Sequence, residues 1–341
     1  MKTGVVGASG YSGGELLRLV LNHPKFELEY IAAGTQAGSA INLLHPQLPS
    51  LSDRIFEPTA ISRMNDCELL FLALPPGESA KFISQIKPEI IVVDLGADFR
   101  LNSSSSWEKY YGGTHAGTWV YGLPEIPGQR EKIARATRVA NPGCYATVIA
   151  VASVPALKLN LIAGGDIVVV AASGTTGAGR QARTNLLGSE VIGSLSSYKF
   201  GGAHQHTPEI EETLSTVGKL EVKVSFTPIL APIARGILAT ITAKLTSTQT
   251  TESIHKMYSD FYQNENFISV LPLPNLPKTS SVLGSNSIQM QVAVDEHANR
   301  LVVSAVIDNL GKGAASQAIQ NANLIVGFPE GTGLNSMGLG A

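Results

Sequence analysis

The stretch that decides the fold is Thr3-Gly4-Val5-Val6-Gly7-Ala8-Ser9-Gly10-Tyr11-Ser12-Gly13-Gly14-Glu15-Leu16-Leu17. It places a short apolar strand, a glycine-rich turn and helical residues in immediate succession. Dinucleotide sites need this order, because glycines let the backbone approach a pyrophosphate and the N–H groups at a helix start bind the anion. The spacing is Gly-x-x-Gly-x-x-Gly, so an ordinary βα turn is the alternative. We predict a dinucleotide site contacted by Gly7, Ser9, Gly10, Tyr11, Ser12 and Gly13.

Apolar runs alternate with helical stretches along the first hundred residues, which predicts βαβ units and a parallel sheet. We expect strands there at 3–7, 28–33, 69–73 and 90–94, and a helix at about 12–22. Later strand-like runs lie at 167–172, 222–227, 237–245, 288–294 and 301–306. The fold class is therefore α/β: a Rossmann-type domain at 1–145, completed by a C-terminal helical segment 313–341, and an α+β catalytic domain with a large mixed sheet at 146–312.

The composition limits the class of protein. A chain of 341 residues exceeds what one core usually organises, which favours two domains. Lys+Arg of 25 against Asp+Glu of 27 gives a net charge of -2, and the absence of a basic run argues against a nucleic-acid partner. We expect no membrane partner and a cytoplasmic location, because the chain lacks signal-peptide features and any run of ~20 apolar residues. Its two cysteines suit a reducing compartment and give no metal-ligand spacing.

The end of the second predicted strand bears on the choice of cofactor. An NAD site usually carries an acidic residue there, ~20 positions after the glycine turn, which bonds the ribose 2′-OH. The segment Ala33-Gly34-Thr35-Gln36 has small polar side chains and no carboxylate. We therefore predict NADP(H), with Thr35 among its contacts, although no arginine stands ready for the 2′-phosphate.

Cys144 is the candidate nucleophile. It follows Asn141-Pro142-Gly143 and precedes the apolar run 148–154, so we expect it in the first turn of a buried helix. The positive end of a helix favours the thiolate, which is the nucleophilic form of cysteine. The alternative, a small buried hydrophobic residue, is our interpretation of Cys67, which has no such setting.

Together with further motifs, these features resemble the N-acetyl-gamma-glutamyl-phosphate reductases of arginine biosynthesis, a family related to the aspartate-semialdehyde dehydrogenases. The resemblance covers essentially the whole chain, and its specific motifs are the Cys144 segment and His204-Gln205-His206-Thr207-Pro208-Glu209-Ile210. Other matching segments are 71–75, 94–101, 121–125, 173–180, 234–236 and 308–315. The chain departs from the family at Gln205, where arginine is more frequent, and at Thr176, where serine is. Gln205 leaves one cation fewer for an anionic substrate.

The resemblance implies NADPH-dependent reduction of N-acetyl-L-glutamyl 5-phosphate to the 5-semialdehyde and phosphate, through a thioester on Cys144. His204 and His206 are the candidates for moving protons, since an imidazole titrates near pH ~6.5. We favour His206, because Thr207-Pro208-Glu209 looks like a helix start that would fix its ring. The remaining histidines, His23, His45, His115, His255 and His297, are interpreted without a catalytic role.

The same resemblance assigns further contacts. Pro75, Gly177, Ala178 and Asn309 would lie at the cofactor. Arg100, Arg180, Glu209 and Arg235 would lie at the substrate, and arginine's planar fork suits phosphate and carboxylate; Arg183 is a weaker candidate. The family also implies a homodimer or homotetramer joined through the second domain.

Three alternatives stay open from the sequence. A reductase for a homologous acyl phosphate, such as N-acetylaminoadipyl or aspartyl phosphate, is close, because one methylene changes binding by only ~1–3 kcal/mol. A non-catalytic NADP-binding regulator would not need Cys144 and the two histidines. A cysteine hydrolase would not need the glycine-rich turn.

Overall fold

The computed structural model describes residues 1–340 and divides into two compact units. The first unit comprises Met1–Pro124, Gly128–Pro142 and Ala314–Leu334, and the second comprises Glu125–Pro127, Gly143–Gly313 and the tail from Asn335. The sequence-based division, 1–145 with 313–341 against 146–312, differs from these units at 125–127, at 143–145, at 313 and in the tail from Asn335. The tail joins the second unit because Asn286 N donates to Asn335 O at 2.8 Å and Ser287 Oγ donates to Ser336 O at 2.5 Å.

The first unit contains a six-stranded parallel sheet in the order β2-β1-β3-β4-β6-β5. Its strands are β1 (Lys2–Val6), β2 (Glu27–Ala32), β3 (Leu69–Leu72), β4 (Ile91–Asp94), β5 (Val120–Tyr121) and β6 (Arg138–Ala140). The four predicted strands and the parallel sheet are confirmed, with ends that differ by one residue. The short β5 and β6 were not foreseen. Strand order reverses at β1, so the carboxyl ends of β1 and β3 form the switch point where open α/β sheets bind ligands.

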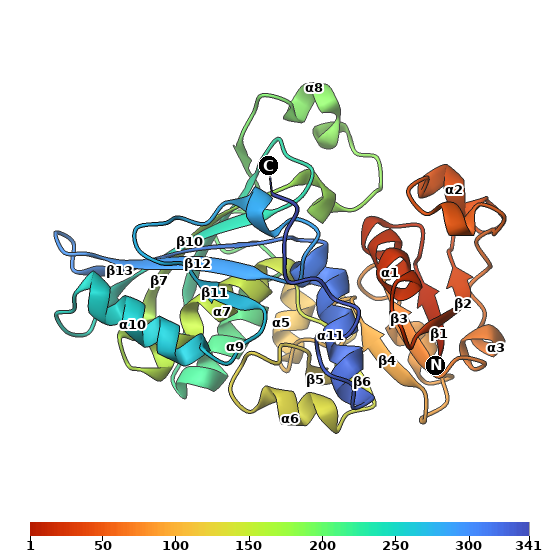
Figure 1. Cartoon of the computed structure of the whole chain (residues 1–341), viewed down its shortest axis with the longest axis horizontal. Coiled ribbons are helices and arrows are strands. Elements are labelled where there is room, and N and C mark those ends of the chain that lie inside the picture. The colour runs from red at the N-terminus through yellow and green to blue at the C-terminus, as the bar shows by residue number, and fades with distance from the viewer. Residues whose placement is uncertain (341) are drawn as a thin grey trace. The chain divides into compact units, whose positions relative to one another are not determined.

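Helices complete the first unit (Figure 1). They are α1 (Tyr11–Leu21), α2 (Ile41–Leu44), α3 (Ile61–Met64), α4 (Ala80–Ile83), α5 (Ser104–Tyr110), α6 (Gln129–Ala134), α11 (Ser316–Ile325) and the 3-10 turn η1 (Pro49–Leu51). Ala318, Ile319 and Ala322 of α11 are fully buried in one core with Leu16 and Phe71. The sequence-distant helix α11 is therefore part of the core of this unit.

Helix α11 also buries amide side chains, which the sequence pattern did not suggest. Asn321 Nδ2 donates to Gly122 O at 2.9 Å and to Asn141 Oδ1 at 3.0 Å, and Asn141 Nδ2 donates to Ala314 O at 3.1 Å. Buried amides are tolerated only when their hydrogen bonds are made. This network fixes Asn141, which follows the end of β6 and precedes the turn to Cys144.

The second unit contains a seven-stranded mixed sheet in the order β11-β12-β13-β10-β7-β9-β8. Its strands are β7 (Ile162–Ser173), β8 (Ser196–Ser197), β9 (Val224–Leu230), β10 (Ile237–Leu245), β11 (Ile268–Val270), β12 (Ile288–Asp295) and β13 (Arg300–Ile307). Antiparallel pairs join β12 to β13, β13 to β10 and β10 to β7, whereas β7 and β9 run parallel. The predicted large mixed sheet is confirmed.

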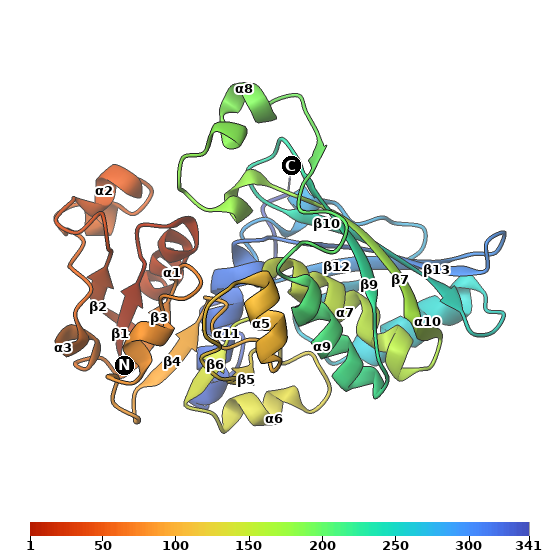
Figure 2. The same ribbon diagram turned by 180° about the vertical axis from the view of Figure 1, so that it is seen from behind.

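One face of this sheet packs against three helices, α7 (Cys144–Lys158), α9 (Thr207–Gly218) and α10 (Thr251–Tyr262). Figure 2 shows these helices together on the same side of the strands. Residues alternate along the strands, so Val170 and Leu238 on the other face are 42% and 37% exposed. The segment after β7 carries η2 (Thr175–Ala178), η3 (Thr184–Leu186) and α8 (Gly188–Val191) and projects away from the three helices (Figures 1 and 2). Among residues 1–340, no helix is long and apolar enough to span a bilayer.

A buried ion pair anchors the chain just before α11. Lys312, in the short π-helical turn η5 (Gly311–Ala315), is fully buried, and its Nζ lies 2.5 Å from Glu125 Oε1. The ammonium also lies 5.7 Å from the centre of the Phe267 ring. This pair explains why Glu125–Pro127 groups with the second unit although the flanking chain belongs to the first.

We expect Lys312→Met to destabilise the protein by about 3–5 kcal/mol, because it leaves the Glu125 carboxylate buried without its cation. The double variant Lys312→Met/Glu125→Leu should recover part of that loss, since hydrophobic groups replace both charges. Thermal unfolding of both variants measures the effect, with the exposed Lys256→Met as the matched control. Equal melting temperatures for native protein and Lys312→Met would contradict the assignment.

Candidate active site

The glycine turn lies at the carboxyl ends of β1 and β3 and requires its glycines. Gly7 has a φ of +82°, and a Cβ there would lie 2.2 Å from Ala73 O. A Cβ on Gly13 would lie 2.4 Å from Gly7 O, so the start of α1 packs directly on the turn. Helix α1 begins at Tyr11, and its N-cap, Gly10, adds no side chain there. The predicted strand, turn and helix are confirmed, and the backbone forms the bare cradle that a pyrophosphate needs.

His45, which was given no catalytic role from the sequence, holds this turn by a hydrogen bond. Its ring is fully buried, and Nε2 donates to Ala8 O at 2.8 Å. A Cβ on Gly14 would lie 2.3 Å from the ring's Cε1, so Gly14 is the residue that gives the imidazole its space. No sequence motif signalled this contact, because it joins positions 31 residues apart through the fold.

The predicted ribose end of the cradle lies where β2 ends at Ala32. Gly34 and Thr35 are exposed, and a Cβ on Gly34 would meet no atom within 4 Å. Residues 33–38 place no carboxylate there. Pro75 follows β3, whose carboxyl end adjoins that of β1.

Cys144 is the first residue of α7, as predicted from the sequence, and Gly143 is the N-cap. The backbone N–H of Gly143 donates to Glu209 Oε1 at 2.7 Å, and this carboxylate is only 2% exposed. A Cβ on Gly143 would lie 2.5 Å from His206 Nε2, so the imidazole packs on the residue before the nucleophile. The turn before Cys144, the His206 ring and Glu209 therefore lie together. Cys67, in contrast, is buried, and burial raises the pKa of its thiol to about 11.

The two histidines of the motif differ in their surroundings. His204 is 3% exposed, and burial is the main cause that lowers its pKa to about 2, followed by the charges of His206 and Lys199. Its Nδ1 accepts from His206 N at 3.0 Å, so the neutral ring carries its proton on Nε2. His206 is the N-cap of α9. Of the pair, His204 is held neutral and packs edge-on against His206, with ring centroids 4.8 Å apart.

Two tyrosines complete the surroundings of Cys144 and were missed in the sequence. Tyr198 Oη donates to Tyr145 Oη at 3.0 Å, and both rings pack edge-on against His204. Burial is the main cause that raises the pKa of both phenols, that of Tyr198 to about 12, so both stay protonated near neutrality. Tyr145 stood next to the nucleophile in the motif, but Tyr198 lies in a segment without any recognisable pattern.

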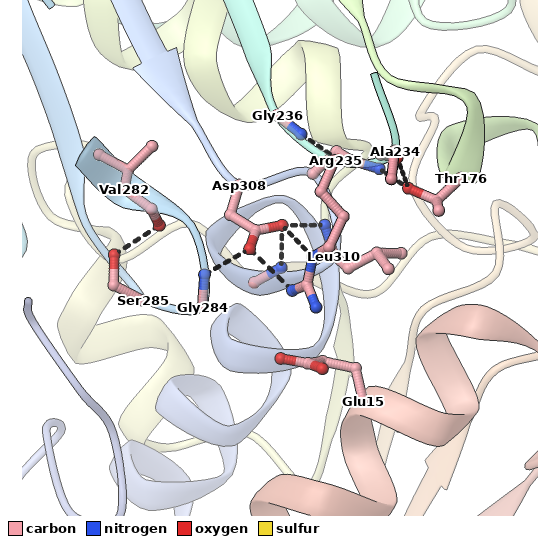
Figure 3. A network of polar contacts seen from close by, with 12 residues as sticks. Glu15, Thr176, Ala234, Arg235, Gly236, Val282, Gly284, Ser285, Asp308 and Leu310 are labelled. Atoms are coloured by element: carbon pink, nitrogen blue, oxygen red, sulfur yellow. Dashed lines mark hydrogen bonds and ion pairs between the residues drawn. The ribbon is translucent and has the colours of Figure 1, made fainter. Parts of the chain in front are cut away.

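A network around Asp308 fixes the loop after β13 (Figure 3). Asp308 is fully buried and accepts from Arg235, whose Nε lies 3.0 Å from Oδ1 and whose Nη2 lies 2.7 Å from Oδ2. The backbone N–H groups of Gly284, Leu310 and Gly311 also donate to it, at 2.7, 2.9 and 3.2 Å. The fork of Arg235, predicted to bind substrate, thus holds a carboxylate of its own chain.

The same loop places the predicted nicotinamide contacts of the second unit together. Asn309 Oδ1 accepts from Gly236 N at 2.8 Å, and Asn309 Nδ2 donates to Thr176 Oγ1 at 3.0 Å. A Cβ on Gly177 would lie 3.7 Å from Asn309 Nδ2, and Ala178 ends the same turn, η2. Thr176, one of the two departures from the family pattern, keeps the hydroxyl that this hydrogen bond needs.

The other predicted substrate arginines belong to different units, Arg100 to the first and Arg180 and Arg183 to the second. Arg100 donates from Nε to Asn141 O at 2.8 Å and from Nη2 to Leu95 O at 2.7 Å, so it ties the loops that follow β4 and β6. Arg180 and Arg183 are exposed in the projecting segment after η2. Within residues 1–340, no group of three or more His, Cys, Asp or Glu residues is placed to hold a metal ion.

Gly313 is a site residue that the sequence did not reveal. A Cβ there would lie 2.7 Å from Cys144 Cβ, and Gly313 N donates to Asp308 O at 2.9 Å. The turn held by Asp308 therefore packs directly against the nucleophile.

A dinucleotide cradle in one unit and a helix-terminal cysteine beside a histidine pair in the other define an oxidoreductase of the semialdehyde dehydrogenase class. Residues 2–136 match the family model "Semialdehyde dehydrogenase, NAD binding domain", and residues 144–309 match "Semialdehyde dehydrogenase, dimerisation domain". The chain belongs to the N-acetyl-gamma-glutamyl-phosphate reductase family. It is 52% identical over 338 residues to the protein of that name from Acidothermus cellulolyticus, covering 99% of this chain and 98% of the relative. It is 51% identical over 339 residues to that of Salinispora arenicola, covering 99% of each.

Solved structures share the fold at low sequence identity. Aspartate semialdehyde dehydrogenase II from Vibrio cholerae is 16% identical with a TM-score of 0.69, covering 95% of this chain and 98% of that chain. Aspartate semialdehyde dehydrogenase from Candida albicans, solved with NADP, is 14% identical with a TM-score of 0.68, covering 94% and 98%. The predicted family and two-domain fold are confirmed.

We expect acid to destabilise the native protein more than His204→Asn, which keeps an acceptor for His206 N. Because the pKa of His204 is lowered from 6.5 to about 2, only the unfolded chain gains a proton between these values. The contribution of His204 is therefore retained above pH 6.5 and is lost below it, by at most about 1.4 kcal/mol per pH unit. Melting temperatures between about pH 7 and about pH 5 measure the difference.

The exposed His297→Asn is the matched control and should follow the native protein. An equal loss of melting temperature in native protein and His204→Asn would show that His204 is not held neutral.

Proposed function

We propose that this protein reduces N-acetyl-L-glutamyl 5-phosphate to N-acetyl-L-glutamate 5-semialdehyde and phosphate, with NADPH, through a thioester on Cys144. The observation that carries the proposal is the position of Cys144 at the first residue of α7, with His206 packed on the preceding glycine. The family membership supplies the substrate class, since the relatives are named for this acyl phosphate.

In the first half of the reaction, Cys144 Sγ attacks the acyl carbon, and the bond from that carbon to the phosphate oxygen breaks. The positive end of α7 favours the thiolate that this attack needs. His206 accepts the thiol proton and donates it to the departing phosphate oxygen. Its ring packs on Gly143, the residue before the nucleophile, which supports this role.

In the second half, bound NADPH would supply a hydride to the acyl carbon of the thioester. The acyl oxygen then carries a negative charge, which collapses to the aldehyde as the C–S bond breaks and its electron pair returns to Cys144 Sγ. His204 is the positioning residue of the pair, because its depressed pKa keeps it neutral while its Nδ1 holds His206 N. Proton transfer is thereby assigned to His206.

We assign the pyrophosphate to the bare turn from Gly7 to Gly13 and the adenosine ribose to the end of β2. A side chain at Gly7 or Gly13 would fill this cradle, so the backbone present fits the group. Thr35 is exposed, and no carboxylate stands within residues 33–38 to bond a 2′-OH or repel a 2′-phosphate. These features support NADP(H) as the preferred cofactor.

We expect Thr35→Asp to lower kcat/KM with NADPH by about tenfold or more, because a carboxylate there repels the 2′-phosphate, while activity with NADH is kept or raised. Initial rates with each cofactor measure the ratio, and Thr35→Asn is the neutral control of equal size. An unchanged NADPH to NADH ratio in Thr35→Asp would place the ribose elsewhere.

The decisive experiment follows the reaction in reverse, by the appearance of NADPH from NADP, N-acetylglutamate semialdehyde and inorganic phosphate. The native protein should give a phosphate-dependent rate, and Cys144→Ser should lower it at least about a thousandfold, because the thiolate is removed. Cys67→Ala is the matched control and should keep the rate, since the Cys67 thiol is buried elsewhere.

The substrate is tested in the same assay with the homologous semialdehydes of aminoadipate and aspartate. A rate with one of these and none with N-acetylglutamate semialdehyde would keep the mechanism and overturn the substrate. A phosphate-dependent rate retained in Cys144→Ser would overturn the thioester.

We further propose a homodimer or homotetramer that uses the open face of the second unit's sheet. Val170 of β7 and Leu238 of β10 are 42% and 37% exposed on neighbouring strands of that face, and apolar side chains on a broad sheet favour association. The family model matched by residues 144–309 is described as a dimerisation domain. A small-molecule substrate and a cytoplasmic location complete the proposal.

A further inference from the structure

The segment that ends in Lys199 is fixed beside the residue that follows the nucleophile. Strand β8 pairs with β9, and Tyr198 N donates to Pro228 O at 3.2 Å. The Tyr198 hydroxyl donates to Tyr145 at 3.0 Å. Lys199 itself has a φ of +43°, a left-handed conformation that is uncommon for a residue with a side chain. Because neighbouring contacts hold this strained backbone in place, they direct the Lys199 side chain to a defined position.

The Lys199 ammonium is hydrogen-bonded to the residue between the two histidines. Its Nζ donates to Gln205 Oε1 at 2.5 Å, and Gln205 stands between His204 and His206 in the chain. The positive charge of Lys199 is one of the causes that lower the pKa of His204, so the ammonium acts electrostatically on the site. The glutamine amide therefore holds a cation next to the residues that surround Cys144.

A second cation, Arg183, acts electrostatically on Lys199. Partial loss of solvent and the charge of Arg183 both lower the pKa of Lys199. When an anion binds between or beside two positive charges, it reduces the electrostatic repulsion between them. The nearby Glu209 carboxylate accepts from Gly143 N, and Asp308 accepts from Arg235, so these acids already serve other groups.

We propose that Lys199, held in place by Gln205, binds an oxyanion of the acyl-phosphate substrate. This inference rests on the proposed function and adds a substrate-binding residue to it. An ammonium is a point charge that suits phosphate or carboxylate oxygens equally, so the two ends of the substrate are distinguished by experiment. The lysine also supplies, from a neighbouring segment, the charge that the glutamine at position 205 lacks.

The kinetic test compares native protein with Lys199→Met in the NADP-reducing direction, where phosphate and the semialdehyde are separate substrates. We expect the KM for one of them to rise about tenfold, with kcat changed less than about threefold, because the lysine contributes to binding and transfers no proton. A rise for phosphate assigns Lys199 to the phosphoryl group, and a rise for the semialdehyde assigns it to the carboxylate. Unchanged KM values for both would overturn the proposal.

Two further variants separate charge from structure. Lys199→Arg keeps a cation and should stay near the native KM, whereas Lys199→Met/Gln205→Arg places the cation on the other partner and should recover at least part of the loss. Lys256→Met removes an exposed lysine from α10 of the same unit and is the matched control. Failure of both cation-bearing variants to differ from Lys199→Met would also overturn the proposal.

A binding measurement keeps this inference distinct from the proposed function. Inorganic phosphate and N-acetylglutamate are each tested for protection of Cys144 against iodoacetamide, which requires no turnover. Lys199→Met should need about tenfold more of one anion for equal protection. If the native protein shows no turnover with any semialdehyde, the proposed function fails, and this protection assay alone decides whether Lys199 binds an oxyanion: equal protection of native protein and Lys199→Met would exclude it.

Discussion

The buried carboxylate of Asp308 is the constraint on which the arrangement of the second unit depends. A buried charge is expensive unless it is paired and hydrogen-bonded. Asp308 meets that requirement with the bidentate Arg235 fork and three backbone N–H groups. These donors come from Arg235 just before β10, from Gly284 in the loop before β12 and from the loop after β13, so a single side chain joins three segments. Asn309 and Gly313 both follow this anchor in the chain and are fixed by it, and Gly313 packs on Cys144.

Charged side chains can either hold other groups of the chain in place or contact substrate, and a sequence motif does not distinguish these two roles. Arg235 holds Asp308, Arg100 holds two backbone carbonyls, and Glu209 holds the Gly143 N–H, although each was predicted to contact substrate. Their substrate contacts stay predictions. The described geometry shows that these side chains first define where the loops of the site stand. Lys199, in contrast, lies in no motif and holds its charge against an amide.

The sequence predicted those parts of the fold and site that depend on local chemistry. The glycine turn and the position of Cys144 at a helix start follow from Gly, Pro and apolar spacing, and both are confirmed. The strand at 237–245 was predicted with its observed ends. Strands β5 and β6 were missed because two and three residues are too short for a period to emerge.

Contacts between positions that are far apart in the sequence could not be predicted from it. The His45 ring under Gly14, the Tyr198–Tyr145 hydrogen bond and the packing of Gly313 on Cys144 each depend on how separate elements meet. No periodicity or motif predicts such a tertiary contact, since each of the two residues, taken alone, is compatible with an ordinary structural position. The separation of roles between His204 and His206 likewise required burial and hydrogen bonds, which only the folded chain supplies.

The discontinuity of the first unit has a consequence for synthesis on the ribosome. The core on one face of its sheet contains Ala318, Ile319 and Ala322 of α11, so that face is not fully covered until α11 has emerged. The buried residues of the core on the other face all lie between Val6 and Val92. The second unit draws nearly all its residues from the contiguous stretch Gly143–Gly313. Domains usually fold in the order in which they are translated. Here the order is reversed: the later-translated unit can reach its native state first, while one face of the earlier unit's sheet stays open to chaperones until α11 has been made.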